Sequence, residues 1–287
     1  GNFKNIWIQP ASGDAGGSLG AALALWHNEL KNNRKINVKD NMKGSYLGPE
    51  YNNKDIKSEL SNLGAVFKEL TNVEIINKTA FEISEGKAIG WFQGRMEFGP
   101  RALGCRSIVA DSRSDEMQRN LNLKVKFRES FRPFAPSILK EDVDQWFEFN
   151  QDSPYMLLVA DVKKNIRYKL NETDNNLFGI DKLNTIRSTI PAVTHIDYSA
   201  RLQTVHKDTN PKYYALISEF KKLTGCPIIV NTSFNVRGEP IVCTVADAFK
   251  CFMGTNLDCL VIGNYFLAKK EQNKELLVNY KNKYDLD

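Results

Sequence analysis

The segment 90–108 carries three arginines at close spacing, separated by glycines and one proline: Arg95, Arg101 and Arg106. A guanidinium group can bind a planar oxyanion such as phosphate or carboxylate through two parallel hydrogen bonds. A short apolar strand is predicted at 88–92, and the proline and glycines that follow it make a stiff, slim turn. We therefore interpret the segment as an anion site. The alternative is a solvated basic loop whose arginines form surface ion pairs.

A second group of cations lies between residues 124 and 136, where lysine and arginine are interleaved with phenylalanine. The group consists of Lys124, Lys126, Arg128 and Arg132, with Phe127, Phe131 and Phe134. Such interleaving can bind nucleic acid, because bases stack on aromatic rings. The prolines at 133 and 136, however, prevent a long regular element, and a narrow anion pocket fits the segment better. Within this pocket, Lys124 and Arg132 are expected at the rim.

Polar side chains follow a buried strand predicted at 227–230. Ser233, Asn235 and Arg237 come after this apolar run, at the C-terminal end of the strand. Open α/β sheets usually bind ligands at that end of their strands. The sequence therefore predicts that these donors and acceptors line a ligand site.

A further strand is predicted within 191–205, where polar residues alternate with apolar ones. Ser199, Arg201 and Gln203 then share one face of the strand. His195 precedes them and stands alone, so we interpret it as structural rather than catalytic.

The N-terminal part of the sequence is predicted to form a strand at 5–9, a glycine-rich turn and a helix that ends near Leu30. Asp14, Gly16 and Gly17 lie in the turn. A strand, a turn with an acid and a helix form a geometry that suits a phosphate or a metal ion. The pattern GxxxxGKS is not present, so this is no Walker A loop. An ordinary connection in which Asp14 caps the helix explains the residues equally well.

Composition limits the classes of function. The chain has 287 residues, 42% of them apolar, and a net charge of +5, without a block rich in lysine and arginine. This balance favours anionic small molecules at least as much as nucleic acid. The five cysteines are odd in number and lack CxxC spacing, which indicates free thiols in a reducing compartment. No apolar run reaches 18 residues and no signal peptide is recognised, so we expect a cytoplasmic protein without a membrane span.

The elements that must position these residues indicate an α/β fold. Helices are predicted at 55–63, 78–84, 115–123, 211–223 and 246–253. Further strands are predicted at 106–111 and 156–162, with a closing hairpin at 257–262 and 265–268. Residues 31–55 are the best linker candidate, 163–190 are expected to form a polar excursion or mobile loop, and the tail past 269 an exposed helix or a frayed end.

The motifs at 126–128 and 233–235 resemble the K-x-R and S-x-N parts of the signature of the YrdC-like fold, which handles carbamoyl-type adenylates. The segments 90–108, 198–205 and 230–240 together look like the C-terminal half of O-carbamoyltransferases of the nodulation-factor, cephalosporin and aminoglycoside type. The match spans about 44 to 266. The resemblance implies a twisted mixed sheet with flanking helices, in α/β (α+β) style, over residues 45–287.

Residues 5–30 look like the end of the other domain of this family, the Kae1-like domain with its actin/Hsp70-type ATPase fold. We expect residues 1–44 to be a C-terminal remnant of that domain and a linker. The metal-binding histidines of the Kae1-like domain have no counterpart here, so we expect a C-terminal fragment of a longer enzyme, incomplete when isolated. The missing N-terminal domain would then act in cis.

In this family, as the resemblance implies, the YrdC-like domain converts carbamoyl phosphate and ATP to carbamoyl adenylate. The Kae1-like domain then transfers the carbamoyl group to a hydroxyl of a small sugar or natural product. The residues expected to be catalytic are Lys126, Arg128, Ser233 and Asn235. Those expected to bind carbamoyl phosphate or the adenylate are Arg95, Arg101, Arg106, Arg201, Gln203 and Arg237.

The resemblance also implies cofactors and partners. Asp14 would ligate a metal, Mg²⁺ or Fe²⁺ or a similar divalent ion in the full-length enzyme, and Gly16 and Gly17 would lie near the nucleotide. ATP is the expected nucleotide. We expect neither a membrane nor a nucleic acid as partner, and the sequence leaves the oligomeric state open, with a homodimer as one option.

Two other functions fit part of the sequence. A YrdC-like factor in tRNA threonylcarbamoylation shares the fold and the adenylate chemistry but uses threonine and bicarbonate. The 94–104 segment and the region around Asp14 argue against it. A non-catalytic RNA-binding module is compatible with the cations and phenylalanines of 124–134, and it would show salt-dependent binding to RNA.

Overall fold

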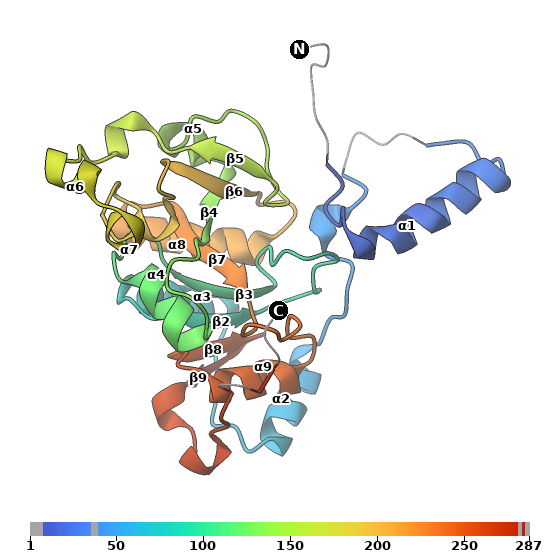
Figure 1. Cartoon of the computed structure of the whole chain (residues 1–287). Helices are drawn as coiled ribbons and strands as arrows, with labels where there is room; N and C mark the ends of the chain where they lie inside the picture. The colour runs from blue at the N-terminus through green and yellow to red at the C-terminus, as the bar shows by residue number, and fades with distance from the viewer. Residues whose placement is uncertain (1–7, 36–39, 281–282, 285–287) are drawn as a thin grey trace.

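A nine-stranded mixed sheet organises the part of the chain that the computed structural model describes, residues 8–35, 40–280 and 283–284. The strand order is β1-β9-β8-β2-β3-β7-β4-β6-β5 (Figure 1). β2 runs parallel to β8 and β4 runs parallel to β6, and the other neighbours are antiparallel. The sheet and its flanking helices confirm the predicted mixed α/β fold.

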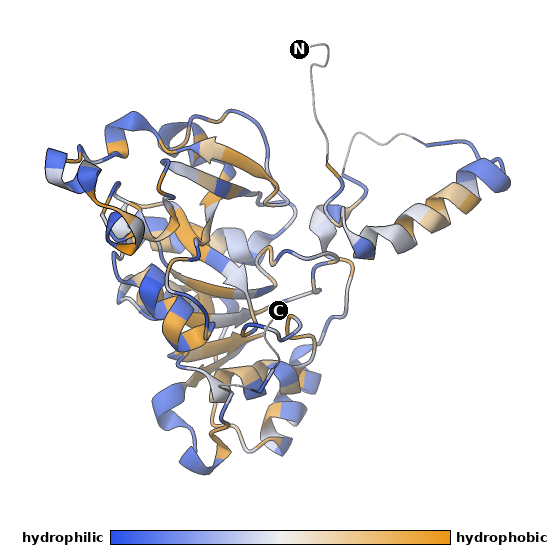
Figure 2. Ribbon diagram, in the orientation of Figure 1, coloured by the Kyte–Doolittle hydropathy of each residue, from blue (hydrophilic) through white to orange (hydrophobic). Residues whose placement is uncertain are grey.

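The strands are short, and most of their residues are buried. Their bounds are β1 Lys68–Glu69, β2 Ile89–Phe92, β3 Arg106–Asp111, β4 Ala135–Leu139, β5 Leu158–Asp161, β6 Ser199–Val205, β7 Ile228–Ser233, β8 Cys259–Ile262 and β9 Tyr265–Ala268. Figure 2 shows apolar residues on these strands and polar ones on the surrounding loops. The predicted strand at 106–111 and the predicted closing hairpin of β8 and β9 are confirmed.

Most of the helices flank the sheet. Their bounds are α1 Asp14–Ala24, α2 Asn53–Asn62, α3 Asn72–Ser84, α4 Met117–Asn120, α5 Val143–Trp146, α6 Glu172–Asn176, α7 Gly179–Leu183, α8 Pro211–Thr224 and α9 Val245–Gly254. In α8, Tyr213, Leu216, Ile217 and Phe220 are buried, which is the spacing of a single apolar stripe. This stripe lets α8 pack beside α3 and against β4 and β7, while α9 packs against β2 and β8.

Two helices differ from their predicted bounds for local reasons. α3 begins at Asn72 rather than 78, because Thr71 and Glu74 form a capping box that starts the helix earlier. The helix predicted at 115–123 begins at Met117 and continues past α4 as a π-helical turn, Leu121–Val125. This turn delivers the chain to Lys126.

β4 was not among the predicted strands, because Pro136 stands inside it. Proline lacks the N–H that a central strand must donate. Here the parallel pairing with β6 begins only at Ser137, while Pro136 pairs with Val230 of β7. The residue that lacks an N–H therefore lies just outside the part of β4 that pairs with β6, and the strand forms despite the proline.

The N-terminal helix stands apart from the sheet (Figure 1). α1 begins at Asp14, and its N-cap Gly13 has no side chain to cap it, so the predicted capping by Asp14 is wrong. Gly16 and Gly17 consequently lie in the first turn of the helix rather than in a loop. None of the α1 residues is buried. Of the strand predicted at 5–9, residues 5–7 lie outside the described residues, and residues 8 and 9 are not in a strand.

Segments predicted as irregular hold some short elements. The excursion 163–190 contains α6 and α7, and Phe178 within it is 93% exposed. All five cysteines are free thiols, as predicted. Four of them are buried, and Cys243 is half-buried. No helix in the described ranges combines the length and the apolar character that a bilayer-crossing helix needs.

Candidate functional site

Lys126 joins the two distant motifs of the sequence. Its Nζ donates to the hydroxyl of Ser233 at 3.2 Å and to the side-chain oxygen of Asn235 at 2.7 Å. It also donates to the backbone carbonyls of both residues. Ser233 is the last residue of β7, and Lys126 directly follows the π-helical turn. The fold thus brings together residues more than a hundred positions apart in the sequence.

The environment of Lys126 weakens its hold on a proton. The side chain is 3% exposed. Burial, together with the nearby positive charge of Arg128, lowers the pKa of Lys126 to about 7. The ammonium group therefore titrates near neutral pH, which is common for groups at functional sites.

Arg128 presents its guanidinium to the same place. Its Nε donates to the side-chain oxygen of Asn122 at 2.6 Å, and its plane lies over the ring of Phe134, 5.0 Å from the ring centre. Burial and the charge of Arg132 lower the pKa of Arg128 to about 10. Within the described residues, its two terminal nitrogens have no protein acceptor, so they can bind an anion.

The backbone between these two cations is unusual. Phe127 has φ of 49°, in the left-handed region that residues other than glycine rarely adopt. Such conformations persist where the surrounding structure imposes them, often at functional sites. Here the backbone N–H of Arg128 donates to the carbonyl of Asn122, which fixes the turn after Phe127.

These groups line a cavity of about 390 Å³, a volume suited to a small ligand. Its walls are formed by Lys126, Arg128, Arg132, Ser233, Asn235, Val236, Arg237, Gly238, Glu239 and Pro240. Arg132 and Arg237 share one carboxylate, that of Glu129, at 3.0 and 2.9 Å.

Arg106 is not part of this cavity. It is fully buried, and its terminal nitrogens donate to the backbone carbonyls of Pro49, Gln93, Gly94 and Cys105. Its guanidinium also lies 3.5 Å from the centre of the Phe92 ring. Arg106 therefore holds the segment 93–105 in place through its terminal nitrogens, while its buried Nε has no hydrogen-bond partner among the described residues.

Arg95 also lies elsewhere. Its side chain is 56% exposed and forms a surface pair with Glu50 at 3.4 Å. It additionally donates to the carbonyl of Gly48. This geometry corresponds to the surface ion pair that the sequence left open as an alternative.

Arg101 and Arg201 form a second cationic pair. Burial lowers the pKa of Arg201, and the nearby charge of Arg101 lowers it further. Among the described residues, neither arginine side chain has an ion pair or a hydrogen bond, and the buried Nε of Arg101 has no acceptor. Two like charges without a counter-ion favour an anion between or beside them.

A buried amide network places Arg101 beside Arg201. Gln203 donates to the carbonyl of Leu103 at 2.9 Å, and Asn231 donates to that of Ala102 at 3.1 Å. Asn231 also donates to Gln203, and Ser137 does the same. The amide of Gln203 thus helps to hold the loop after Arg101 against β6 and β7. Gln203 does not line the cavity that contains Lys126.

His195 lies near Arg201, and Ser199 lies beside His195. Ser199 donates to Asp197 at 2.7 Å, and burial lowers the pKa of His195. The backbone of Phe134, whose ring lies under Arg128, is next to His195. Phe134 thus contacts Arg128 through its ring and His195 through its backbone.

The N-terminal candidates do not form a site with these residues. Asp14 is an exposed carboxylate at the start of α1, and the described residues contain no group of three or more metal-ligating side chains. A single carboxylate does not hold a metal ion, so the residues present do not fit a resident metal. Gly16 packs against the carbonyl of Ala11, and Gly17 faces open space.

The phenylalanines of 124–134 offer little surface for bases. Phe134 is 3% exposed and its ring is covered by Arg128, while Phe127 packs against the core. Phe131 alone of the three is exposed, at 48%. One exposed ring does not make the row of stacking platforms that single strands need.

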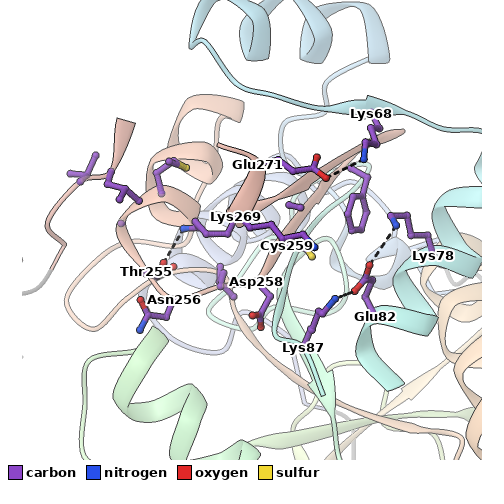
Figure 3. A pocket seen from close by; sticks show the side chains of 18 residues that line it. Lys68, Lys78, Glu82, Lys87, Thr255, Asn256, Asp258, Cys259, Lys269 and Glu271 are labelled. Atoms are coloured by element: carbon purple, nitrogen blue, oxygen red, sulfur yellow. Dashed lines mark hydrogen bonds and ion pairs between the residues drawn. The ribbon is translucent and has the colours of Figure 1, made fainter. Parts of the chain in front are cut away.

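A larger cavity of about 700 Å³ lies between α3, β8, β9 and the tail (Figure 3). Its ion pairs are Lys78–Glu82, Lys87–Glu82 and Lys68–Glu271. Lys269 donates to the backbone carbonyls of Phe252 and Thr255 at the end of α9. Most of its cations thus already have partners, in contrast to Arg128 and the Arg101–Arg201 pair.

Two residues at the cavity, Asn122 and Glu239, were not among the residues predicted from the sequence. Asn122, which holds Arg128, lies in a predicted helix without any motif around it. Glu239 lines the cavity, and its carbonyl accepts from Asn235 at 2.6 Å. The position of Glu239 in the segment 237–240, directly after Asn235, could have indicated that it lies near the site. Its contacts with Tyr280 and Tyr284 could not be predicted from the sequence.

The comparisons with known proteins agree with one another. The family described as carbamoyltransferase C-terminus matches residues 80–269. The chain is 54% identical to the uncharacterized protein sll1178 of Synechocystis over its full length, and it covers 47% of that protein. It is 41% identical to nodulation protein NolNO of Sinorhizobium fredii, with 96% of this chain and 38% of the relative covered. It is 31% identical to nodulation protein U of Rhizobium fredii, with 83% and 35% covered. The chain thus spans less than half the length of each of these relatives.

Proposed function

The chain belongs to the carbamoyltransferase C-terminus family, and we propose that it is the part of a longer O-carbamoyltransferase that binds carbamoyl phosphate and ATP and forms carbamoyl adenylate. The remainder of that protein would transfer the carbamoyl group to a hydroxyl of a small sugar or natural product. The observation that carries this proposal is the contact of Lys126 with both Ser233 and Asn235, beside the open guanidinium of Arg128.

The remaining hydrogen-bond capacity of Ser233 and Asn235 matches a carbamoyl group. The oxygen of Asn235 accepts from both Lys126 and Ser233, and its Nδ2 donates one hydrogen to the carbonyl of Glu239. One N–H of Asn235 and one lone pair of Ser233 remain. A carbamoyl group offers one carbonyl acceptor and one NH₂ donor, so both of its polar ends find a partner.

The phosphate group would lie against Arg128, with Arg132 at the rim. The terminal nitrogens of Arg128 lack a protein acceptor within the described residues, and a guanidinium holds a phosphate through two hydrogen bonds. Lys126 contributes its charge at short range and keeps Ser233 and Asn235 in position. The cavity thereby combines a charged end with a neutral, polar end.

ATP needs a second set of cations, because two polyanions must be held together against their repulsion. The Arg101–Arg201 pair supplies it. Carbamoyl phosphate is first hydrolysed to carbamate and inorganic phosphate. A carbamate oxygen then attacks the α-phosphorus of ATP, which forms carbamoyl adenylate and releases pyrophosphate. The fixed guanidinium groups stabilise the charge that develops on the phosphate oxygens.

The proposal is tested by pyrophosphate release from ATP. We expect release that depends on carbamoyl phosphate, loss of release in Lys126→Ala, and little change in Lys124→Ala, which alters an exposed cation of the same segment. Release with threonine and bicarbonate but not with carbamoyl phosphate would favour the tRNA-modification alternative. Absence of release and of binding for carbamoyl phosphate and ATP would overturn the proposal.

A further inference from the structure

The C-terminal tail packs into the body of the protein beside the cavity. Tyr280 is 3% exposed, and its ring meets that of Tyr284 edge to face at 5.7 Å between centres. The ammonium group of Lys283 lies over both rings, at 4.5 and 5.6 Å. These residues fall beyond the 80–269 segment that the family shares. Their contribution is therefore separate from the motifs described above.

Gly254 at the end of α9 makes room for this packing. A Cβ atom at Gly254 would lie 2.3 Å from Cδ2 of Tyr280, far inside contact distance. Gly254 does not have a positive φ, so glycine is required here for the absence of a side chain and not for its backbone conformation. The ring of Tyr280 occupies a slot that even an alanine would close.

Both tail tyrosines end on Glu239. Their hydroxyl groups donate to the same oxygen, Oε1, each at 3.1 Å. The other carboxylate oxygen accepts from the backbone N–H of Val236 at 2.9 Å, and the backbone carbonyl of Glu239 accepts from Asn235. Glu239 thus connects the tail to two residues of the cavity wall.

Glu239 is also a negative charge that lines a cavity of cations. A carboxylate whose oxygens are engaged by two phenols and one backbone N–H stays in place and has part of its charge neutralised. Without the phenols, the same carboxylate would be drawn to the neighbouring cations. It would then compete with an incoming anion.

We propose that Tyr280 and Tyr284 are positioning residues for the anion-binding cavity, and that they act by holding Glu239 in place. The inference rests on the proposed function in so far as the cavity binds a phosphate-bearing anion. It adds a segment outside the family motifs to the site. Neither tyrosine lines the cavity.

The experiment measures the dissociation constant for inorganic phosphate by calorimetry, well below the melting temperature, in Tyr280→Phe, Tyr284→Phe and the double variant. Phenylalanine keeps the ring packing and removes only the donors. We expect the double variant to bind phosphate about 3- to 10-fold more weakly, as for two hydrogen bonds acting indirectly. The matched control is Tyr168→Phe, whose exposed hydroxyl has no hydrogen bond within the described residues.

Two further variants separate positioning from general loss of stability. In a Glu239→Gln background, the tyrosine substitutions should cause no further loss of phosphate affinity, because they act through the carboxylate. Gly254→Ala should reproduce the loss with both tyrosines present, because it displaces the ring of Tyr280. Hydrogen exchange of residues 235–240 should become faster in the double variant and stay unchanged in Tyr168→Phe.

Phosphate affinity and hydrogen exchange equal to the wild type in the double variant would overturn the inference while leaving the proposed function intact. The inference would also be overturned if the tyrosine substitutions lowered phosphate affinity equally in the wild-type protein and in Glu239→Gln. The tyrosines would then not act through the carboxylate of Glu239. A wild-type protein that binds neither phosphate nor carbamoyl phosphate would overturn the proposed function and this inference together.

Discussion

The Nζ of Lys126 lies 2.7 Å from the side-chain oxygen of Asn235, although 109 positions separate the two residues in the chain. The contact joins the turn before β4 to the end of β7. Because β4 and β7 are hydrogen-bonded neighbours, this part of the cavity rests on the sheet rather than on a free loop. The predictions that follow test whether this contact and the cations around it bind carbamoyl phosphate.

Lys126→Ala should weaken binding of carbamoyl phosphate by roughly 1.5–3 kcal/mol, or about 10- to 150-fold, because a buried charge near the anion is lost. Lys124→Ala should change the affinity much less, since Lys124 is exposed. Calorimetry on both variants, with melting temperatures to check folding, makes the comparison. Equal small losses at both positions would contradict the role given to Lys126.

Binding of sulfate should weaken as pH rises through about 7. The pKa of Lys126 is lowered to about 7, so the group is charged below this pH and neutral above it. Sulfate keeps its charge over this range, and its affinity should fall by up to about tenfold per pH unit above 7. Calorimetry from pH 6 to 9 measures the slope. Lys126→Met should bind more weakly at pH 6 and lose most of the slope, and an unchanged slope would assign the titration to another group.

Ser233→Ala and Asn235→Ala should weaken carbamoyl phosphate more than inorganic phosphate, because these side chains would face the carbamoyl end of the ligand. Arg128→Ala should weaken both anions alike. The ratio of the two dissociation constants is the readout, and it cancels general effects on the cavity. The same ratio in all three variants would show that Ser233 and Asn235 do not recognise the carbamoyl group.

Arg106→Ala should lower the free energy of unfolding by about 3–5 kcal/mol, because four backbone carbonyls would lose a buried charged donor. Arg95→Ala, in the same segment but exposed, should cost under about 0.5 kcal/mol. Urea unfolding of the two variants gives both values. A small effect at Arg106 would return that residue to the candidates for substrate binding.

The sequence predicted most elements of the fold whose apolar pattern is strong. The strand at 106–111 and the hairpin of β8 and β9 lie where alternating or continuous apolar runs indicated them. β4 escaped because Pro136 is compatible with a central strand only where the neighbouring ladder begins one residue later. That register depends on the tertiary pairing and cannot be read from local composition.

The site was predictable to a similar degree. The resemblance named Lys126, Arg128, Ser233 and Asn235, and the fold places them together. The sequence could not separate the arginines of 90–108, because their roles depend on partners elsewhere. Arg106 donates to backbone carbonyls that include the carbonyl of Pro49. The loop after Arg101 is instead held by the side-chain amides of Gln203 in β6 and Asn231 in β7. The contact of the tail tyrosines with Glu239 carries no local signal at all.

The measurement that tests the central claim most directly is a crystal structure with carbamoyl phosphate bound. We expect the carbamoyl group within about 3.2 Å of both the Ser233 hydroxyl and the Asn235 amide nitrogen, with the phosphate against the terminal nitrogens of Arg128. Carbamoyl phosphate found in the lysine-lined cavity between α3 and β9, or beyond hydrogen-bond distance of both Ser233 and Asn235, would contradict it.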